Sequence, residues 1–473
     1  MTGPDLLVLL PLLIVAGTAV LVLVGIAVRR HHGLTVWLSL AGLVAAAAAL
    51  GPAAGRIPRQ VTPLLQVDAY GLLFWGLLLA ASAAVVGLAY AYLERQAVPR
   101  EELYVLLLSG TLGAMVLAAS RHFASLVLGL EILSVSIYAS SAYLRSRERS
   151  VEAGLKYLIL ASASGAFLLF GVALLYAGSG TLDFSRLVAG GVPGGLGIAG
   201  AILVLVGIGF KLALVPFHMW AADVYQGAPA PVSAFIATVS KAGIFALLLR
   251  YGYGSGLLEV PAVVLVLGGV AVACMVAGNL LALLQQNVKR ILAYSSIAHM
   301  GYALVAFLAA GALATRAVTV YLVAYGLALL GAFGILTMLS TADREPERLE
   351  DLRGLASRHP WLAGAFTTMV FSLAGIPLTG GFLGKFYVLA SGVTAARWGL
   401  VLTLVVTSTA GLYYYLRIVA TLYDEPAAEG SVLAAPAWSS GAILLVLTIL
   451  LIWLGVYPAA ALDVIRLATA GIR

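Results

Sequence analysis

Runs of apolar residues recur along almost the whole chain, and short polar segments separate them. Each run is long enough to cross the roughly 30 Å hydrocarbon layer of a bilayer as an α-helix. The pattern therefore predicts an all-α, polytopic membrane protein with about fourteen transmembrane helices. The predicted spans cover residues 5–28, 33–52, 69–93, 103–120, 122–144, 153–178, 195–222, 230–252, 258–284, 289–312, 317–340, 361–391, 396–423 and 438–458.

Two of these spans carry residues that interrupt a helix. The seventh contains Pro216, and the twelfth contains Pro377 within a cluster of glycines at positions 375, 380 and 381. Such breaks free backbone groups that lipid cannot satisfy, so they persist only where protein or water covers them. A kink adapted to lipid would account for one break, but not for two in corresponding positions.

The spacing of the breaks also predicts an internal repeat, because they lie five helices apart and an odd number of helices inverts orientation. Helices 4–8 and 9–13 are therefore expected to form two inverted five-helix repeats, each with a broken helix (7 and 12). Paired broken helices in inverted repeats are typical of transporters, with the ion path at the breaks. The predicted segments are 1–95 (helices 1–3), 96–254 (first repeat), 255–425 (second repeat) and 426–473 (helix 14).

Composition supports this class and excludes several functions. The chain is 62% hydrophobic and only 10% charged, against about 25% charged residues in soluble domains. Its net charge of +7 comes from basic residues scattered through short loops, which form no stripe for nucleic acid. A single Cys274 and six histidines without metal-ligand spacing argue against a redox centre in this chain.

Charge also predicts the orientation in the membrane. The first apolar run is followed by Arg29 and Arg30 and lacks a basic segment before it, so it is expected to remain as an uncleaved helix. Under the positive-inside rule, the larger group of basic loop residues faces the cytoplasm, which places both termini outside. The long charged loop 341–359 is then cytoplasmic, and it is either a contact for a partner protein or a solvated connector.

Five ionisable residues lie inside otherwise apolar spans: Glu131, Lys156, Lys211, Lys241 and Lys385. A charged group near the bilayer centre costs roughly 2.5–3.5 kcal/mol, so it is rare unless it pairs, lines a wet cavity or moves charge. Only five of the 27 basic residues are lysines, so the chain uses Arg at its surface and Lys within its spans. Burial lowers the proton affinity of Lys, whereas Arg stays charged, which predicts that these lysines carry protons.

The positions of these residues indicate different roles. Glu131 is expected to pair with Lys211 on the broken seventh span, either as a switch of the lysine's proton affinity or as a static ion pair. Lys241 lies at the centre of the eighth span without an acid in its own helix, and it is expected to load and release a proton if water reaches it. Lys385 follows the second break and is expected to face the cavity there.

Other polar residues have several interpretations. Lys156 lies about one turn into the sixth span, so snorkelling to the interface competes with a role in transport. His218 at the first break and His299 in the tenth span are candidate neutral relays, although a lone buried histidine is usually a packing residue. The remaining polar residues are expected at helix ends or in loops: Asp223, Arg250, Asn279 and Lys289.

Several segments together resemble the antiporter-like membrane subunits of the proton-pumping NADH:quinone oxidoreductase, respiratory complex I. They follow one another in the family's order along most of the chain. The segments are Gly129-Leu130-Glu131, residues 152–158 (EAGLKYL), 210–220 (FKLALVPFHMW) and 223–229 (DVYQGAP), Ser240-Lys241, residues 286–299 (QNVKRILAYSSIAH), and Gly375-Ile376-Pro377 to Gly384-Lys385-Phe386.

Three features favour the subunit N branch of this family. The chain ends about fifteen residues after its last span, it has Lys at position 385, and it contains the stretch 224–229 (VYQGAP). One departure is Ala222, where the family usually has proline. This change removes no ionisable group and leaves the resemblance intact.

The resemblance implies a function and a set of site residues. Glu131 and Lys211 would form the coupled pair, Lys241 would be the central proton carrier, and Lys385 would close the route to the outside. The chain would then be a membrane-arm subunit that translocates protons while other subunits transfer electrons from NADH to quinone.

The resemblance also implies partners and a location. Flavin and iron-sulfur clusters are expected in partner subunits and no cofactor in this chain. Expected partners are a neighbouring antiporter-like subunit, small membrane subunits and the lipid bilayer, with no nucleic acid. The expected location is the bacterial inner membrane. Two alternatives stay open: a multisubunit cation/proton antiporter and a membrane-bound hydrogenase-like complex.

Overall fold

The computed structural model describes residues 2–96, 98–189, 194–425 and 437–471, and nearly all of its regular structure is helical. The exception is a short antiparallel hairpin, in which Arg59 pairs with Val67 and Val61 with Leu65. The elements are α1 (Gly3–Val8), α2 (Leu10–Val28), α3 (His32–Ala48), α4 (Leu50–Ala54), β1 (Arg59–Val61), β2 (Leu65–Val67), α5 (Ala69–Glu94), α6 (Glu102–Ala119), α7 (Phe123–Ser141), α8 (Glu148–Ser179), α9 (Phe184–Ala189), α10 (Gly194–Lys211), α11 (Met219–Gly227), α12 (Ala230–Phe235), η1 (Ile236–Ser240), α13 (Lys241–Gly254), η2 (Leu257–Glu259), α14 (Pro261–Leu283), α15 (Val288–Ala309), α16 (Gly311–Leu339), η3 (Leu349–Leu352), α17 (Leu355–Arg358), α18 (Pro360–Ala374), α19 (Gly380–Thr394), α20 (Trp398–Tyr423), α21 (Trp438–Val456) and α22 (Ala459–Thr469).

Thirteen helices among the described residues are long and apolar enough to cross a membrane, which confirms a polytopic all-α protein. The predicted twelfth span is missing from these thirteen because it consists of two half-helices, α18 and α19, of 15 residues each. The predicted seventh span, 195–222, is also shorter than expected, since α10 ends at Lys211. Continuous apolar sequence therefore overestimates helix length where proline and glycine divide a span.

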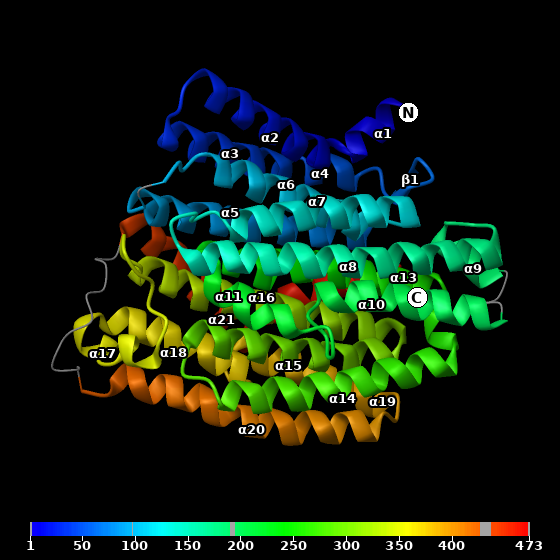
Figure 1. The fold of residues 1–473 in the computed structure, drawn as a ribbon. Coiled ribbons are helices and arrows are strands. Elements are labelled where there is room, and N and C mark those ends of the chain that lie inside the picture. The colour runs from blue at the N-terminus through cyan, green and yellow to red at the C-terminus, as the bar shows by residue number, and fades with distance from the viewer. Residues whose placement is uncertain (1, 97, 190–193, 426–436, 472–473) are drawn as a thin grey trace.

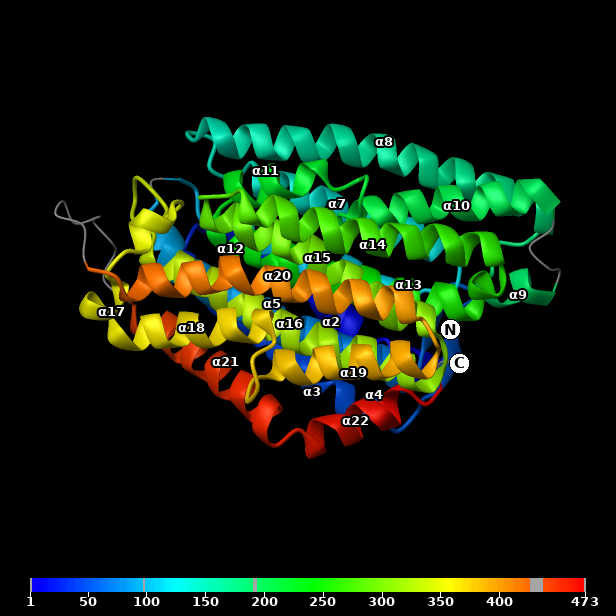
Figure 2. The ribbon, with the colours of Figure 1, turned by 90° about the horizontal axis from the view of Figure 1, so that it is seen from below.

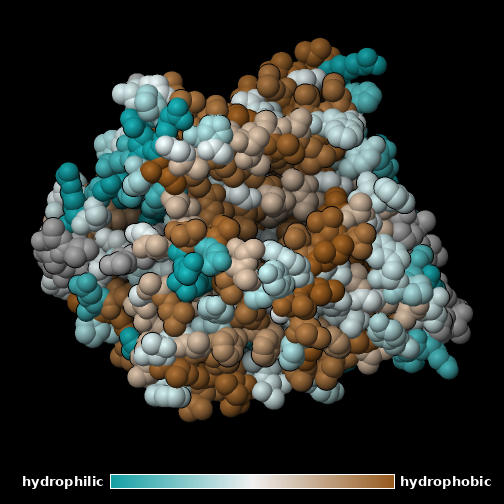
Figure 3. Space-filling view, turned by 180° about the vertical axis from the view of Figure 1, so that it is seen from behind, coloured by the Kyte–Doolittle hydropathy of each residue, from teal (hydrophilic) through white to brown (hydrophobic). Residues whose placement is uncertain are grey.

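The long helices run side by side through the bundle (Figure 1). The segment α12-η1-α13 and helix α15 form its interior, because 94% of the residues in the most apolar part of each are buried. In α2, α8, α20 and α21 only 28% of the corresponding residues are buried. The helices that carry Lys241 and His299 are therefore the most enclosed spans. Hydrophobic side chains cover much of the middle of the face in Figure 3, and hydrophilic ones gather toward its two sides.

The order of elements repeats along the chain. Helices α6, α7, α8, α10 and α12-α13 are followed by α14, α15, α16, the pair α18-α19 and α20. In each group the first two helices pack closely on each other, α6 on α7 in the first group and α14 on α15 in the second. These boundaries are compatible with the predicted repeats 96–254 and 255–425. The inverted relation stays a prediction, and the boundary at 426 lies outside the described residues.

Helices α1 and α22 reach the same end of the bundle, and α17 lies at the opposite end (Figures 1 and 2). The charged loop 341–359, which includes η3 and α17, is thus at the end away from the chain's first and last helices. The placement of both termini outside the membrane stays a prediction.

Candidate functional site

The first helix break separates α10 from α11 at residues 212–218. Pro216 lies within it, and Ala213 adopts a positive φ of 57°. Side chains satisfy two of the freed backbone groups. The Val215 N–H donates to the Cys274 Sγ at 3.1 Å, and the Trp220 Nε1–H donates to the Phe210 carbonyl at 2.9 Å. Protein side chains therefore satisfy part of the break, while Pro216 itself lies exposed on the surface of the chain.

Lys211 is the last residue of α10, and its side chain lies inside the bundle. Its Nζ donates to the Ser134 Oγ at 2.6 Å. Glu131 lies about one turn before Ser134 on α7 but on the exposed surface of the chain. Among the described residues, no ion pair joins Glu131 to Lys211 within 4.0 Å. Lys211 is therefore bonded to the helix that carries Glu131, but to Ser134 and not to Glu131 itself.

A small cavity connects these partners. Glu131, Ser164 and Lys211 all line it, together with apolar residues of α7, α8 and α10. Its volume of about 10 Å³ is near the minimum that holds one water molecule. The geometry thus places Glu131 and Lys211 around a water-sized space.

The second break separates α18 from α19. Gly375 has a φ of 85°, a left-handed conformation that glycine adopts without strain, and Leu378 has a φ of 72°. Lys385 of α19 reaches back across the break, and its Nζ donates to the Ala374 carbonyl at 2.6 Å and to the Ser408 Oγ at 2.8 Å. Ala374 ends α18, so the ammonium lies where unpaired carbonyls and the helix dipole favour positive charge.

Lys241 follows a third irregularity, which the sequence pattern did not reveal. Residues 236–240 form a π-helical segment, η1, directly before it, and such segments are frequent at functional sites. Only 1% of Lys241 is exposed. Its Nζ donates to the hydroxyl of Ser296, which is also hydrogen-bonded to the hydroxyl of Tyr325.

Polar side chains continue from Lys241 towards Lys385. His299 lies one turn after Ser296 on α15, with its ring 5.4 Å from that of Tyr325. Its two ring nitrogens are hydrogen-bonded to the hydroxyls of Tyr321 at 2.5 Å and Tyr415 at 3.0 Å. The predicted relay position of His299 is therefore inside a cluster of phenolic hydroxyls.

The second half of this route runs from Tyr415 to Lys385. The rings of Tyr414 and Tyr415 are 4.4 Å apart. The Tyr414 hydroxyl donates to the Asn279 Oδ1 at 3.0 Å, and the Asn279 Nδ2 donates to the Tyr302 hydroxyl at 2.8 Å. The Lys385 Nζ lies 5.6 Å from the centre of the Tyr302 ring. We call the side chains from Ser296 to Ser408 the hydroxyl chain; it comprises Ser296, Tyr325, His299, Tyr321, Tyr415, Tyr414, Asn279, Tyr302 and Ser408.

Of these side chains, the sequence predicts only His299 as a relay, and it places Asn279 at a helix end or in a loop. Asn279 is 2% exposed and joins two tyrosines. Neutral hydroxyls on apolar helices give no charge signal. One clue was available, because tyrosine is frequent in this sequence, with 21 residues.

Lys156 lies at the surface, with 41% of its side chain exposed. It forms ion pairs with Glu152 at 2.6 Å and with Asp223 at 2.7 Å, and Asp223 also pairs with Arg290 at 2.7 Å. The expectation that Asp223 is only a helix-end residue was therefore wrong, since it links α8, α11 and α15. His218 is half-buried at the start of α11.

The expectation for Arg250 was also incomplete. Both of its terminal nitrogens donate to Asp68, at 2.9 and 2.8 Å, and this bidentate pair is largely buried. Asp68 in turn caps α5 through the Gly71 N–H at 2.8 Å. The pair thus connects the start of α5 with α13 in the interior.

The loop 341–359 is neither wholly solvated nor wholly available to a partner. Glu345 is 7% exposed and forms an ion pair with Lys289, and it also accepts hydrogen bonds from Tyr92 and Arg147. Burial by itself would raise the pKa of the Glu345 carboxyl, but the nearby cations and the Tyr92 hydroxyl hold this pKa below its usual value. A solvated connector is thus wrong for this part of the loop.

Lys289 is also more than a helix-entrance residue, because it is 1% exposed. Besides Glu345, its Nζ bonds the carbonyls of Ala228 at 2.9 Å and Gln226 at 3.3 Å, at the end of α11. The loop is therefore tied to the half-helix that follows the first break.

Comparisons with known proteins identify the family of the chain. Residues 120–411 match the family described as "NADH:quinone oxidoreductase/Mrp antiporter, TM". The chain therefore belongs to this family of antiporter-like membrane subunits. Within it, the chain is 48% identical over 470 residues to NADH-quinone oxidoreductase subunit N of Methylococcus capsulatus, covering 98% of this chain and 95% of that protein. It is 46% identical to subunit N of Ectopseudomonas mendocina, with coverage of 98% and 97%. The predicted subunit N branch is confirmed.

Solved structures give the same result for the fold. A chain of respiratory complex I from Thermus thermophilus with bound aureothin matches with a TM-score of 0.84 and 35% identity, over 96% of this chain and 98% of that one. A chain of the Mrp complex from Dietzia matches with a TM-score of 0.88 but only 22% identity, over 100% and 98%. The Mrp likeness shows the shared fold alone.

Proposed function

We propose that this chain translocates protons as a membrane-arm subunit of NADH:quinone oxidoreductase, while other subunits oxidise NADH and reduce quinone. The curated relatives at 46–48% identity over nearly the full length are subunit N of that enzyme. The observation that carries the proton role is the hydroxyl chain, which begins at Lys241 and α15 in the enclosed interior and reaches Lys385 through side chains of α16, α20 and α14.

Lys241 is proposed as the central carrier. It is buried without an acidic partner, so the neutral amine is a stable alternative to the ammonium form. Ser296 accepts its hydrogen bond, and hydroxyls can both donate and accept, as can a neutral histidine through its two ring nitrogens. The hydroxyl chain therefore has the chemistry to pass a proton towards Lys385.

Lys385 is proposed as the exit. Its ammonium is stabilised by the Ala374 carbonyl and by Ser408, so this position favours the charged form more than an apolar site would. Release of the proton would leave the Ala374 carbonyl with a weaker partner. Proton loss at this lysine would therefore couple to the packing of the two half-helices.

Glu131 and Lys211 are proposed as the switch that controls Lys241. Both line a water-sized cavity, and Lys211 bonds Ser134 on the helix that carries Glu131, so small movements of α7 or α10 would change the strength of their interaction. Among the described residues, no chain of hydrogen bonds joins Lys211 to Lys241. The rings of Tyr157, 5.3 Å from the Lys211 Nζ, and Tyr225, 5.9 Å from the Lys241 Nζ, flank these lysines. Water entry between them is the proposed gated step.

The exposed position of Glu131 supports a neighbouring subunit as partner. The carboxylate lies on the outer face, beside α8, of which many apolar side chains are exposed. A charge that faces lipid is expensive, so another membrane subunit is proposed to cover it. Flavin and iron-sulfur clusters are proposed for other subunits, and the end of the bundle with α1 and α22 is proposed to face outward from a bacterial inner membrane.

The alternatives fit less well. The Mrp chain and a chain of a membrane-bound sulfane sulfur reductase match at only 22% and 23% identity. These values show a common fold, whereas 48% identity over 470 residues indicates subunit N. Flavin and iron-sulfur absorbance with NADH oxidation in the purified native assembly would distinguish complex I from a hydrogenase or an antiporter.

The direct test is NADH-driven proton uptake by membrane vesicles that contain the complex with Lys241→Ala or Lys385→Ala. We expect either substitution to reduce uptake at least tenfold, with NADH-to-quinone electron transfer measured in the same vesicles. Lys156→Ala serves as a control for loss of a lysine, because this residue lies at the surface. Normal proton uptake in both Lys241→Ala and Lys385→Ala would contradict the proposed roles.

A further inference from the structure

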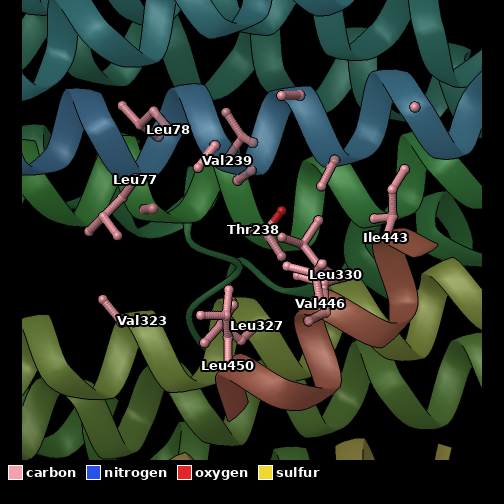
Figure 4. A pocket seen from close by; sticks show the side chains of 18 of the residues that line it. Leu77, Leu78, Thr238, Val239, Val323, Leu327, Leu330, Ile443, Val446 and Leu450 are labelled. Carbon is pink, nitrogen blue, oxygen red and sulfur yellow. The ribbon is translucent and has the colours of Figure 1, made fainter. Parts of the chain in front are cut away.

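An apolar pocket of about 540 Å³ lies between α5, the η1-α13 segment, α16 and α21 (Figure 4). This volume is within the range of about 300–1,000 Å³ that is usual for ligand pockets. None of its lining residues is charged, and only Thr238 and Tyr325 have hydroxyl groups. The pocket is not used by the hydroxyl chain, apart from the shared residue Tyr325.

Both hydroxyl groups are engaged elsewhere. Thr238 donates to the Ala234 carbonyl of its own helix at 2.7 Å, and the Tyr325 hydroxyl is hydrogen-bonded to Ser296. A ligand with a polar head would therefore exchange its hydrogen bonds to water for at most two partly engaged hydroxyls, which is unfavourable. The chemistry of the lining fits a hydrocarbon chain and disfavours a quinone ring.

The pocket opens sideways at membrane depth. Ala80 near the middle of α5 and Val446 near the middle of α21 are exposed, whereas Phe74, Thr238 and Val239 are buried at its floor. Figure 4 shows side chains of α16 and α21, such as Leu327 and Leu450, around the same space. The opening thus faces the layer in which lipid tails are the solvent, and an empty space of this size would leave its walls without dispersion contacts.

We propose that this pocket holds one acyl chain of a membrane phospholipid, with the headgroup outside the pocket. The seated chain would contact Thr238 and Val239 of η1, the π-helical segment that leads into Lys241. The binding site does not depend on the proton-carrying role of Lys241, because it follows from the shape, depth and lining of the pocket.

Gly326 provides a way to fill the pocket. It lines the cavity, and a Cβ atom added at this position meets no atom within 4 Å. Gly326→Leu is therefore expected to occupy the space that the acyl chain takes. Gly17→Leu is the matched control, since Gly17 is an exposed helical glycine on α2 with the same open surroundings. Ala80→Phe at the mouth is a second blocking variant if Gly326→Leu does not assemble.

The test uses the purified complex in phosphatidylethanolamine and phosphatidylglycerol vesicles. A phosphatidylethanolamine with a diazirine in the middle of one acyl chain is the probe, and labelled peptides are identified by mass spectrometry. We expect labelling at Thr238 and Val239, reduced at least fivefold by Gly326→Leu or Ala80→Phe and unchanged by Gly17→Leu. NADH oxidation reports that each complex is assembled.

Three outcomes would overturn the proposal. The first is labelling confined to exposed residues such as Val446, which would mean that only surrounding lipid is in contact. The second is floor labelling that both blocking variants leave unchanged. The third is labelling of the floor by a photoreactive ubiquinone but not by the lipid probe, which would identify a quinone tail as the occupant.

Discussion

The two helix breaks each have a buried lysine beside them, but the two ammonium groups bond different partners. At the first break, Lys211 belongs to the half-helix that ends there, and its ammonium leaves the break to bond Ser134 on α7. At the second, Lys385 belongs to the half-helix that begins there, and its ammonium returns to the Ala374 carbonyl at the end of α18. Both lysines therefore bond a further helix, Lys211 through Ser134 and Lys385 through Ser408, but only Lys385 also bonds a carbonyl at its own break.

The difference indicates two roles for a lysine near a break. Depending on which half-helix carries it, the lysine interacts with a charged residue of another helix or stabilises the break itself. Lys211 lies beside a cavity shared with the exposed Glu131. Lys385 lies beside Ser408 and the ring of Tyr302 within the bundle. This contrast supports an input role for the first break and an exit role for the second.

The sharpest test of the contrast compares Lys211→Met with Lys385→Met. Both changes should reduce NADH-driven proton uptake at least tenfold. Only Lys385→Met should also lower thermal stability, by about 1–3 kcal/mol, because it leaves the buried Ala374 carbonyl without its partner. Proton uptake and thermal unfolding of the purified complex provide both measurements. Equal stability losses in the two variants would remove the distinction between the breaks.

The first break also differs from the second in having a buried ion pair beside it. Lys289, the partner of Glu345, bonds the end of α11, which is the half-helix after the first break. Glu345→Ala should destabilise the protein by about 3–5 kcal/mol, because it leaves Lys289 as an unpaired buried charge. The double variant Glu345→Leu/Lys289→Met should be less destabilised than Glu345→Ala. Thermal unfolding and retention of this chain in the purified complex measure both, and an additive double variant would contradict the pairing.

The same carboxyl predicts a dependence on acid. The pKa of Glu345 is lowered in the folded protein, so its contribution to stability is present above the unfolded value of about 4.3 and is lost as pH falls through the lower, folded value. Below about pH 4.3, we expect the thermal stability of the Glu345→Gln variant to fall less steeply with pH than that of the unmodified complex. Parallel pH profiles would contradict this expectation.

Asn279 tests the hydroxyl chain between the two central lysines. Asn279→Leu removes the only amide in this chain of described residues and separates Tyr414 from Tyr302. We expect proton uptake to fall several-fold with little effect on NADH-to-quinone electron transfer. Asn279→Gln should retain part of the proton uptake that Asn279→Leu loses. Tyr253→Phe is a control, because Tyr253 bonds a backbone carbonyl outside the hydroxyl chain. Unchanged uptake in Asn279→Leu would show that protons take another route.

The smallest expected effects concern the side chains that cover the breaks. Cys274→Ala removes the acceptor for the Val215 N–H, and Ser372→Ala removes the acceptor for the Gly381 N–H at 3.0 Å. Each should lower stability by about 1 kcal/mol, and Cys274→Ser should restore part of the loss at the first break. Thermal unfolding checks all three. A larger loss for Cys274→Ala than for Lys385→Met would reverse the proposed contrast between the breaks.

Much of this architecture could be predicted because its signals are local. A run of apolar residues is a membrane span whatever its neighbours are, and Pro216 or Gly375 disturbs a helix through its own covalent structure. An internal lysine such as Lys241 is informative for the same reason, since the unfavourable burial of charge does not depend on knowing its partner. The order of these signals was also sufficient to indicate the family.

The partners of these residues could not be predicted, because they depend on which helix faces meet. The sequence by itself determined the class of protein, the spans, the two breaks and the buried lysines. Only the tertiary structure decided that Lys211 bonds Ser134 and not Glu131, that Lys385 bonds the end of α18, and that Lys289 pairs with Glu345. Hydropathy and backbone chemistry are properties of each segment, whereas hydrogen bonds between segments arise only when packing brings distant residues within about 3 Å.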